Sequence, residues 1–302
     1  MLRTIGFCPR ARCTISTTGL VFDIDEAQAM VAQAFIRTEL FTTYKYNTSL
    51  AMASIRSNSQ QEDDDEEEEV VGTLECNTQI SIPLDNLIEC LMLFYGPGSG
   101  SSSGGGGGGI GVSSLHHGVD DLRGATTVEL GFDGPGGDFQ VLLEERGVIS
   151  VCRLATFQAE RAIDLDFSQS PVIQQLIIRS SWLQDAFNEL DPTSDSISIS
   201  ISAHEPYFRI ATVGNGGSTE MTYARDERVL DSYFCNEEVE NRFKLGLVLR
   251  CRSALGMSEK TKVRVNRRGF LCLQFMVPTV TEQSFVNFVF APLVAPDDDA
   301  QQ

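Results

Sequence analysis

The 302-residue sequence lacks the motifs of the common catalytic sites. It has no G-x-S-x-G, H-E-x-x-H or P-loop spacing and only three histidines. His116 and His117 lie in a glycine-rich stretch with no acidic or cysteine partner at ligand spacing. A two-metal nuclease site would need a cluster of carboxylates, and the candidates are Glu129, Asp133, Asp138, Glu144 and Glu145. These residues fall at predicted strand edges and in a D-G-P-G-G turn, where solvent-exposed acidic residues are common. We therefore predict no catalytic residues, no metal site and no cofactor.

Long apolar runs and paired cysteine motifs are also absent. No run reaches the ~18 residues that a membrane span requires, and the first residues contain no apolar signal region. The eight cysteines include no C-x-x-C pair, and four of them stand in apolar periodic segments: Cys76, Cys90, Cys152 and Cys272. We predict reduced cysteines in a soluble intracellular protein with no membrane association.

Basic residues are scarce. The chain has 23 Lys and Arg against 42 Asp and Glu, for a formal net charge of -19. Residues 62–69 are all acidic, as are residues 297–299, and without these two runs the net charge is still -8. An acidic protein cannot hold nucleic acid tightly through bulk attraction and counterion release. Any role on DNA must therefore depend on something other than overall charge.

The first half of the sequence alternates between strand-like segments and two stretches of extreme composition. Residues 53–71 become polar and then acidic, which predicts a disordered loop. Residues 96–114 are rich in glycine and serine, which predicts a flexible insertion. Pro83 opens a segment with apolar residues at helical spacing, so we predict a helix there. Period-two patterns predict strands at 11–16, 20–24, 29–37, 41–46, 74–82, 126–132, 139–144 and 148–154.

The second half repeats this order of elements. We predict a helix at 181–190, capped by Ser180 or Ser181, and a short helix near 250–257. Strands are predicted at 172–178, 196–202, 207–213, 218–223, 229–235, 242–249, 262–266, 270–277 and 285–292. In both halves the last helix precedes three strands, which is a weak internal repeat.

The G-N-G-G sequence at 214–217 could be a phosphate-binding loop or a turn. Residues alternate with period two on both sides of it, and no helix follows, so a dinucleotide site is not favoured. Glycine and asparagine tolerate positive φ, which favours a tight hairpin. Together these patterns predict an α+β protein of two domains: an N-terminal domain at 1–154, a connector at 155–162, a C-terminal domain at 163–294 and an acidic tail at 295–302.

Six segments, in order, resemble the checkpoint sliding-clamp subunits of the Rad-one family, which belong to the nine-one-one complex and are relatives of the proliferating-cell nuclear antigen. They are LECNTQISIPLDNLIECL, EERGVISVC, LDPTSDSISISIS, PYFRIATVGNGGSTEMTY, FCNEEVENRFKLGLV and NRRGFLCLQFMV. The resemblance implies two similar α+β domains and a ring of three subunits, with helices lining the hole. In the family a strand and a pore-lining helix precede the segment that resembles CTISTTGLVFDIDEAQAMVAQAFI, and this sequence has only about ten residues there. We therefore expect the first domain to lack its opening strand and helix.

The resemblance also implies a function. The chain is expected to be a non-catalytic subunit of a nuclear heterotrimer that encircles double-stranded DNA. Its expected partners are two other clamp subunits, a clamp loader, and checkpoint and repair proteins. A 3′-to-5′ exonuclease, an activity ascribed to some relatives, is the alternative, and a β-rich scaffold without a link to DNA is a third interpretation.

Two sets of residues follow as candidates for these roles. The basic residues nearest the second-domain helices are expected to face DNA: Arg179, Arg250, Arg252 and Lys260. Clamp rings close by pairing edge strands of neighbouring subunits. The corresponding interface residues are Val148, Ile149, Ser150, Val151, Cys152, Thr219, Met221 and Tyr223.

Overall fold

A computed structural model describes residues 1–47, 77–93, 126–161, 165, 167–226, 228–279 and 283–293. The predicted disordered loop at 53–71, the glycine and serine insertion at 96–114, the histidine pair at 116–117 and the tail at 295–302 lie outside these residues.

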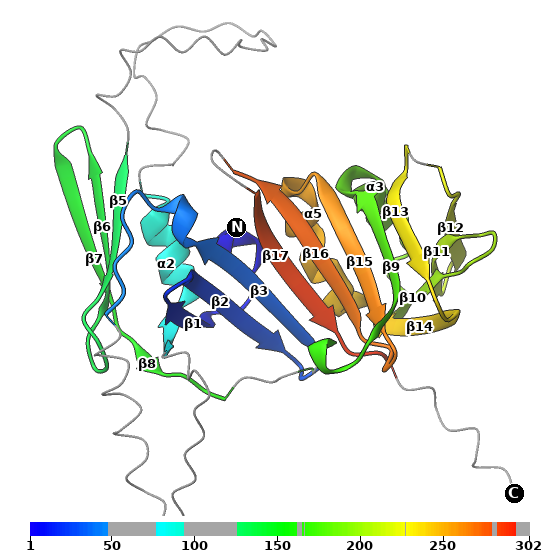
Figure 1. Ribbon diagram of the computed structural model, residues 1–302, viewed down its shortest axis with the longest axis horizontal. Helices are drawn as coiled ribbons and strands as arrows, with labels where there is room; N and C mark the ends of the chain where they lie inside the picture. The colour runs from blue at the N-terminus through cyan, green and yellow to red at the C-terminus, as the bar shows by residue number, and fades with distance from the viewer. Residues whose placement is uncertain are drawn as a thin grey trace, which may run out of the picture.

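Three antiparallel sheets contain the described strands (Figure 1). The largest sheet runs through both halves of the chain in the order β13 (Leu230–Cys235), β9 (Val172–Arg179), β15 (Lys260–Asn266), β16 (Leu271–Pro278), β17 (Gln283–Phe290), β3 (Met30–Arg37), β2 (Gly19–Glu26), β1 (Arg10–Ser16), β4 (Thr78–Pro83) and β8 (Phe157–Gln158). A four-stranded sheet has the order β12 (Gly217–Tyr223), β11 (Phe208–Gly214), β10 (Ser196–Ile201) and β14 (Val239–Lys244). A three-stranded sheet has the order β5 (Thr127–Phe132), β6 (Phe139–Glu145) and β7 (Val148–Leu154).

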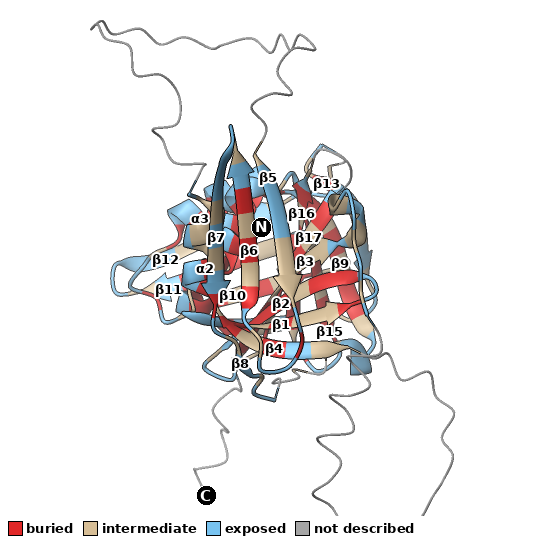
Figure 2. Ribbon diagram, turned by 90° about the vertical axis from the view of Figure 1, so that its left-hand side faces the viewer, coloured by how far each residue is buried: buried red, intermediate tan, exposed pale blue. Residues whose placement is uncertain are grey.

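The described helices are α2 (Leu84–Leu91), α3 (Ser180–Glu189), α4 (Leu245–Val248) and α5 (Arg252–Met257), with short 3-10 turns at η1 (Leu2–Thr4), η2 (Thr38–Leu40), η5 (Phe167–Gln169) and η6 (Leu249–Cys251). Helices α2 and α3, which are labelled in both Figure 1 and Figure 2, lie on the same side of the ten-stranded sheet. In α3 the buried Leu183, Ala186 and Phe187 recur at helical spacing, so one face of this helix packs into the core. Helix α3 packs against α5.

The second half of the chain contains the same β-α-β-β-β unit twice. One unit is β9, α3, β10, β11 and β12, and the other is β14, α4 with α5, β15, β16 and β17. The opening strand of each unit pairs with the other unit, because β9 lies beside β15 and β14 lies beside β10. The two units are therefore interlocked, and neither sheet of this half is complete without both.

The first half contains one such unit and part of a second. The unit is β4, α2, β5, β6 and β7, and the strands β1, β2 and β3 form the remaining triplet. Strand β4 lies beside β1, as β14 lies beside β10. Within the described residues, no strand occupies the position beside β5 that β9 has beside β15. This arrangement of antiparallel sheets with few helices matches the expected α+β fold.

The two halves meet where β17 pairs with β3. Buried side chains stand opposite each other along this pair: Val286 with Ala34, Phe288 with Ala32, and Phe290 with Met30. The small side chain of Ala32 on β3 leaves room for Phe288 of β17. The hydrophobic core consequently continues from one half into the other.

Two predicted strands are wrong. Residues 41–46 form no strand; instead the Tyr44 hydroxyl donates to the carbonyl oxygen of Ser16 at 2.5 Å. The strand predicted at 242–249 ends at Lys244, and helix α4 begins at the next residue. Leu245, Leu247 and Val248 are all buried in that helix, and their alternation with Gly246 looks like a strand in the sequence. Periodicity cannot separate the two over so short a segment.

Two predicted details at turns have different outcomes. Helix α3 begins at Ser180, but no side chain caps it, because the Ser180 hydroxyl lies 2.8 Å from the Thr261 hydroxyl. The G-N-G-G hairpin is confirmed: Gly214 pairs with Gly217 across a two-residue loop. A Cβ on Gly214 would come within 2.2 Å of the Asp191 carboxylate and would displace that side chain. Gly217 has a φ of 137°, which favours glycine.

Candidate assembly edges and helical face

Strand β7 presents one edge of the three-stranded sheet. Among the described strands it pairs only with β6. Val148, Ile149 and Val151 are 58%, 60% and 46% exposed, and Figure 2 shows β7 largely exposed beside the partly buried β6. Ser150 and Cys152 are half-buried and point toward the core, as does the buried Leu154. The predicted interface segment therefore has an apolar outer face and an open edge, a combination that natural proteins usually cover.

The backbone groups along the open edge of β7 can be assigned from the β6–β7 hairpin. Glu145 and Val148 close a two-residue loop in which Arg146 and Gly147 have positive φ. The closing pair of such a loop is hydrogen-bonded, and hydrogen-bonded pairs then alternate with non-hydrogen-bonded pairs. The N–H and C=O groups that point outward belong to Ile149, Val151 and Arg153.

Strand β12 is an open edge of the four-stranded sheet, because among the described strands it pairs only with β11. The same alternation from the Gly214–Gly217 closing pair assigns the outward backbone groups to Ser218, Glu220 and Thr222, whose side chains are exposed. The predicted interface residues Thr219, Met221 and Tyr223 are the intervening positions, and all three are half-buried.

Met221 and Tyr223 also pack against the core of their own sheet. The Tyr223 hydroxyl donates to the carbonyl of Trp182 at 3.1 Å. Burial and the nearby charge of Asp185 raise the pKa of Tyr223 to about 12, so this hydroxyl keeps its proton. A charge placed at Met221 would thus disturb the subunit itself as well as any partner on this edge.

The pairing of β17 with β3 gives an internal example of how such edges join. Strand β17 ends one β-α-β-β-β unit, as β7 does, and β3 ends a three-strand run, as β12 does. In the internal junction, inward-facing side chains stand opposite inward-facing side chains. In an equivalent junction of β7 with a β12-like edge, Ser150, Cys152 and Leu154 would stand opposite the inward-facing side chains of the partner strand.

The exposed side of the helices carries few positive charges. Helix α3 exposes Gln184, Asp185, Asn188 and Glu189, and α2 exposes Asp85 and Glu89. The exposed basic residues of the described helical segments are Arg3, Arg250 and Arg252. The sequence patterns did not suggest Arg3; its place on η1, which packs against α5, depends on the fold.

Arg250 and Arg252 are already engaged within the protein. The Arg250 guanidinium lies 2.8 Å from the Glu26 carboxylate and 5.4 Å above the Phe7 ring, so it joins the two halves of the chain. Nη2 of Arg252 donates to the carbonyl of Phe187 at 2.6 Å. Glu26 offsets much of the charge that Arg250 could present to a phosphate.

Arg179 and Lys260 form a separate pair. They stand opposite each other on β9 and β15, and Lys260 lies 2.5 Å from the Asp231 carboxylate. Arg179 is exposed immediately before α3. The structure therefore divides the four candidate DNA-facing residues into two pairs rather than one cluster.

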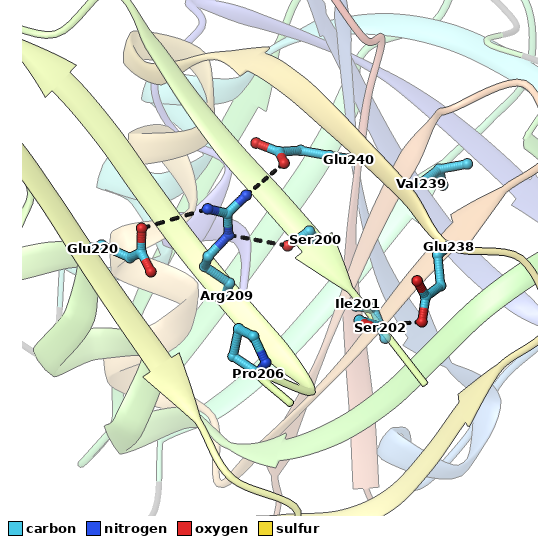
Figure 3. A pocket seen from close by; sticks show the side chains of 9 residues that line it. All are labelled: Ser200, Ile201, Ser202, Pro206, Arg209, Glu220, Glu238, Val239 and Glu240. Carbon is cyan, nitrogen blue, oxygen red and sulfur yellow. Dashed lines mark hydrogen bonds and ion pairs between the residues drawn. The ribbon is translucent and has the colours of Figure 1, made fainter. Parts of the chain in front are cut away.

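A cavity of about 400 Å³ lies on the outer face of the four-stranded sheet (Figure 3). Its central cation, Arg209, is 3.4 Å from the Glu220 carboxylate and 2.5 Å from that of Glu240. Because of these mutual ion pairs, none of Arg209, Glu220 and Glu240 is an isolated acid or base poised for catalysis. Across the part of the chain that the structure describes, no three His, Cys, Asp or Glu residues gather as a metal site would require.

No helix among the described residues has the length and apolar character needed to cross a bilayer.

The duplicated units, the interlocked sheets and the helices on one side define a DNA sliding-clamp fold. The structure is similar to a chain of the PCNA2–PCNA3 complex from Sulfolobus tokodaii, with a TM-score of 0.64 over 96% of this chain and 93% of that chain, at 13% sequence identity. The family model described as "Repair protein Rad1/Rec1/Rad17" matches residues 1–277, and the chain belongs to this family. The family resemblance read from the sequence is confirmed.

Individual relatives agree with this assignment. The "Cell cycle checkpoint protein RAD1" of Homo sapiens is 30% identical over 97% of this chain and 86% of its own length. The "DNA damage checkpoint control protein rad1" of Schizosaccharomyces pombe is 25% identical over 99% of this chain and 84% of its own length. The "DNA repair exonuclease REC1" of Mycosarcoma maydis is 25% identical over 51% of this chain and 40% of its own length.

Proposed function

We propose that this chain is a non-catalytic subunit of a heterotrimeric checkpoint clamp that encircles double-stranded DNA in the nucleus. Two other clamp subunits complete the ring, a clamp loader opens it, and checkpoint and repair proteins bind it. The observation that carries this proposal is the pair of open edges, β7 and β12, at the positions that β17 and β3 occupy in the internal junction. Strand addition at both edges extends each outer sheet into a neighbouring subunit.

A closed ring explains how an acidic protein can work on DNA. Dissociation from DNA requires the ring to open rather than phosphate contacts to break, so high affinity is unnecessary. Only residues that face the hole need to be basic. Because α2 and α3 expose acids, we propose that the partner subunits supply most of the positive lining.

The proposed division into domains follows the sequence prediction. The N-terminal clamp domain is 1–154, the C-terminal clamp domain is 163–294, and 295–302 is a tail. The proposed connector at 155–162 is tied to the first half, because β8 pairs with β4 and Nη1 of Arg12 donates to the Glu160 carbonyl at 3.2 Å.

Reconstitution tests the proposed function. The purified chain, mixed with the two other clamp subunits of its organism, is expected to give a 1:1:1 complex that a clamp loader can place on circular DNA. Native mass spectrometry and retention on nicked circular DNA measure these two steps. A chain that stays monomeric would exclude the clamp role. The same preparation is expected to leave a labelled single strand intact, whereas degradation that a chelator stops would support the exonuclease alternative.

Arg3 gives the sharpest test of the DNA-facing surface. It is exposed on η1, and its side chain, unlike that of Arg250, makes no hydrogen bond or ion pair within the described residues. In the reconstituted ring, Arg3→Glu is expected to weaken binding to linear duplex and to reduce the slope of log K against log[salt] by about 1. Fluorescence anisotropy across a salt series measures both effects.

Arg242→Glu is the matched control for Arg3→Glu. Arg242 is exposed on β14, next to the fully buried Phe243, and so faces away from the core of its sheet. The control changes the net charge by the same amount and should leave the salt slope unchanged. Equal slopes for the two variants would contradict the assignment of the helical face to DNA.

A further inference from the structure

Helix α3 carries the only tryptophan of the chain, and it lies beside the open edge of β12. Trp182 is the third residue of the helix and is 43% exposed. Tyr223, the last residue of β12, donates its hydroxyl to the carbonyl of Trp182 at 3.1 Å. The start of α3 and the end of β12 are therefore in contact, and a neighbour that adds a strand to β12 would come close to this helix.

The indole lies on the flank of α3 that faces away from α5. Oγ of Ser258, the residue after α5, donates to Oγ of Ser180 at 2.7 Å. Nη2 of Arg252 donates to the carbonyl of Phe187 at 2.6 Å. At 3.6 residues per turn, Ser180 and Phe187 fall on one flank of α3, and Trp182 falls roughly opposite them. The tryptophan is thus on the flank that the other helices of the subunit leave open.

The internal junction of β17 with β3 shows how an aromatic ring beside such an edge can be used. Phe7, from the half of the chain that contains β3, stacks on Phe288 of β17 with ring centroids 6.2 Å apart. The guanidinium of Arg250, from the half that contains β17, lies 5.4 Å from the centre of the Phe7 ring and 2.8 Å from the Glu26 carboxylate. The β3 side therefore supplies a ring and an acid, and the β17 side supplies a cation that contacts both.

The surface beside β12 has the ring and the acid but not the cation. Strand β12 ends a three-strand run as β3 does, and Trp182 supplies the ring. Asp185 is exposed three residues further along α3, so the two side chains are neighbours on the helix surface. Helix α3 contains no lysine or arginine, and none from the part of the chain that the structure describes lies over the indole.

We infer that Trp182 anchors the β12 junction by receiving a lysine or arginine from the neighbouring clamp subunit. The cation lies over the indole, the strongest cation–π acceptor among the side chains, and Asp185 offsets its charge. The partner is thus a clamp subunit with an exposed basic residue on the helix beside its edge strand. A second copy of this chain does not fit, because its corresponding helix α2 exposes Asp85 and Glu89 and contains no lysine or arginine. This inference rests on the proposed function, since it names the partner chemistry at one of the two ring junctions.

Fluorine NMR of the full chain tests the anchor. The chain is labelled with 5-fluorotryptophan, which gives one resonance because Trp182 is the only tryptophan. Each of the two other clamp subunits is then added without label. The subunit that pairs with β12 is expected to move the resonance and to lower its solvent isotope shift between H2O and D2O by about half or more. The subunit that pairs with β7, at the opposite end of the molecule (Figure 1), should leave the resonance in place.

Native mass spectrometry of the same samples separates the two ways in which this test can fail. If the 1:1:1 ring forms and the resonance stays in place with either subunit, the anchor is wrong and the proposed function stands. If neither subunit binds, the proposed function and the anchor both fail.

Substitutions separate the contribution of the aromatic ring from that of the acid. Trp182→Ala is expected to weaken binding of the β12-side subunit by about thirtyfold, and Trp182→Phe by about fivefold or less. Trp182→Leu should lie close to alanine, because it keeps an apolar group but no ring face. Asp185→Asn should weaken binding by about fivefold and reduce its dependence on salt.

Phe234→Ala is the matched control, because Phe234 is 49% exposed on β13, outside both junctions, and this variant should bind as the wild type does. Isothermal titration calorimetry measures these affinities. Wild-type affinity for Trp182→Ala, or equal affinities for the phenylalanine and leucine variants, would overturn the inference.

Discussion

Replacing Phe288 with alanine is expected to lower the free energy of unfolding by about 3 to 5 kcal/mol, because it removes a large side chain from the junction of the two halves. Phe288 is completely buried on β17 and stands opposite Ala32 of β3. Its ring centroid lies 6.2 Å from that of Phe7, 5.7 Å from that of Phe275 and 6.2 Å from that of Phe290.

The cost should fall at the upper end of this range. The residue opposite is only an alanine, and the backbone pairing of β17 with β3 holds the two strands apart, so the neighbours cannot collapse into the space. The variant also loses three ring contacts, each of which adds about 0.5 to 1.5 kcal/mol beyond the area that it buries.

Urea denaturation followed by circular dichroism measures this effect. The matched control is Phe234→Ala on β13, where the side chain is 49% exposed, and its loss should be about 1 kcal/mol or less. Phe288→Leu should fall between the two because it keeps part of the buried volume. If both alanine variants lose the same stability, the junction of β17 and β3 does not hold the two halves together as the structure indicates.

The sequence predicts the strands well where one face is buried. The serines and isoleucines of β10 alternate strictly, and Ile197, Ile199 and Ile201 are all buried. The sequence pattern fails where apolar residues belong to a short helix, as at Leu245 and Leu247. Four or five residues are too few to distinguish the period of two of a strand from the period of 3.6 of a helix. The order of strands in the sheets also cannot be predicted from local sequence patterns, because the pairing of β17 with β3 joins residues about 250 positions apart.

The candidate site is predicted in outline but not in detail. The sequence places β7 and β12 at edges, yet it assigns the interface to Met221 and Tyr223, whose side chains turn toward their own core. It also counts Arg250 as a charge for DNA, although Glu26, distant in sequence, lies 2.8 Å away. Contacts between residues distant in sequence determine both features, and local patterns hold no information about such contacts.

Replacing Glu220 with proline is expected to break ring assembly at the β12 edge while leaving the subunit folded. The Glu220 N–H points away from β11, because Glu220 and Ala211 form a non-hydrogen-bonded pair in the hairpin. Proline at an outward-facing edge position therefore removes no hydrogen bond within the sheet. In the ring, a carbonyl of the neighbouring strand would lose the N–H of residue 220 as its hydrogen-bond donor. An unsatisfied carbonyl of this kind costs about 1 to 3 kcal/mol, which weakens assembly by about tenfold to a hundredfold.

Glu220→Ala separates the backbone effect from the side-chain effect. It removes the same carboxylate and its contact with Arg209, which Glu240 still holds, but it keeps the N–H. Native mass titration against the two other clamp subunits should show near wild-type assembly for alanine and strong loss for proline.

The β7 edge provides an independent pair of variants, Val151→Pro and Val151→Ala, because the Val151 N–H also points outward. In the proposed heterotrimer β7 and β12 would face different neighbours, so each proline should weaken one pairwise contact by about tenfold to a hundredfold and spare the other. Full heterotrimer formation by both proline variants would mean that the ring does not close by strand addition at these edges.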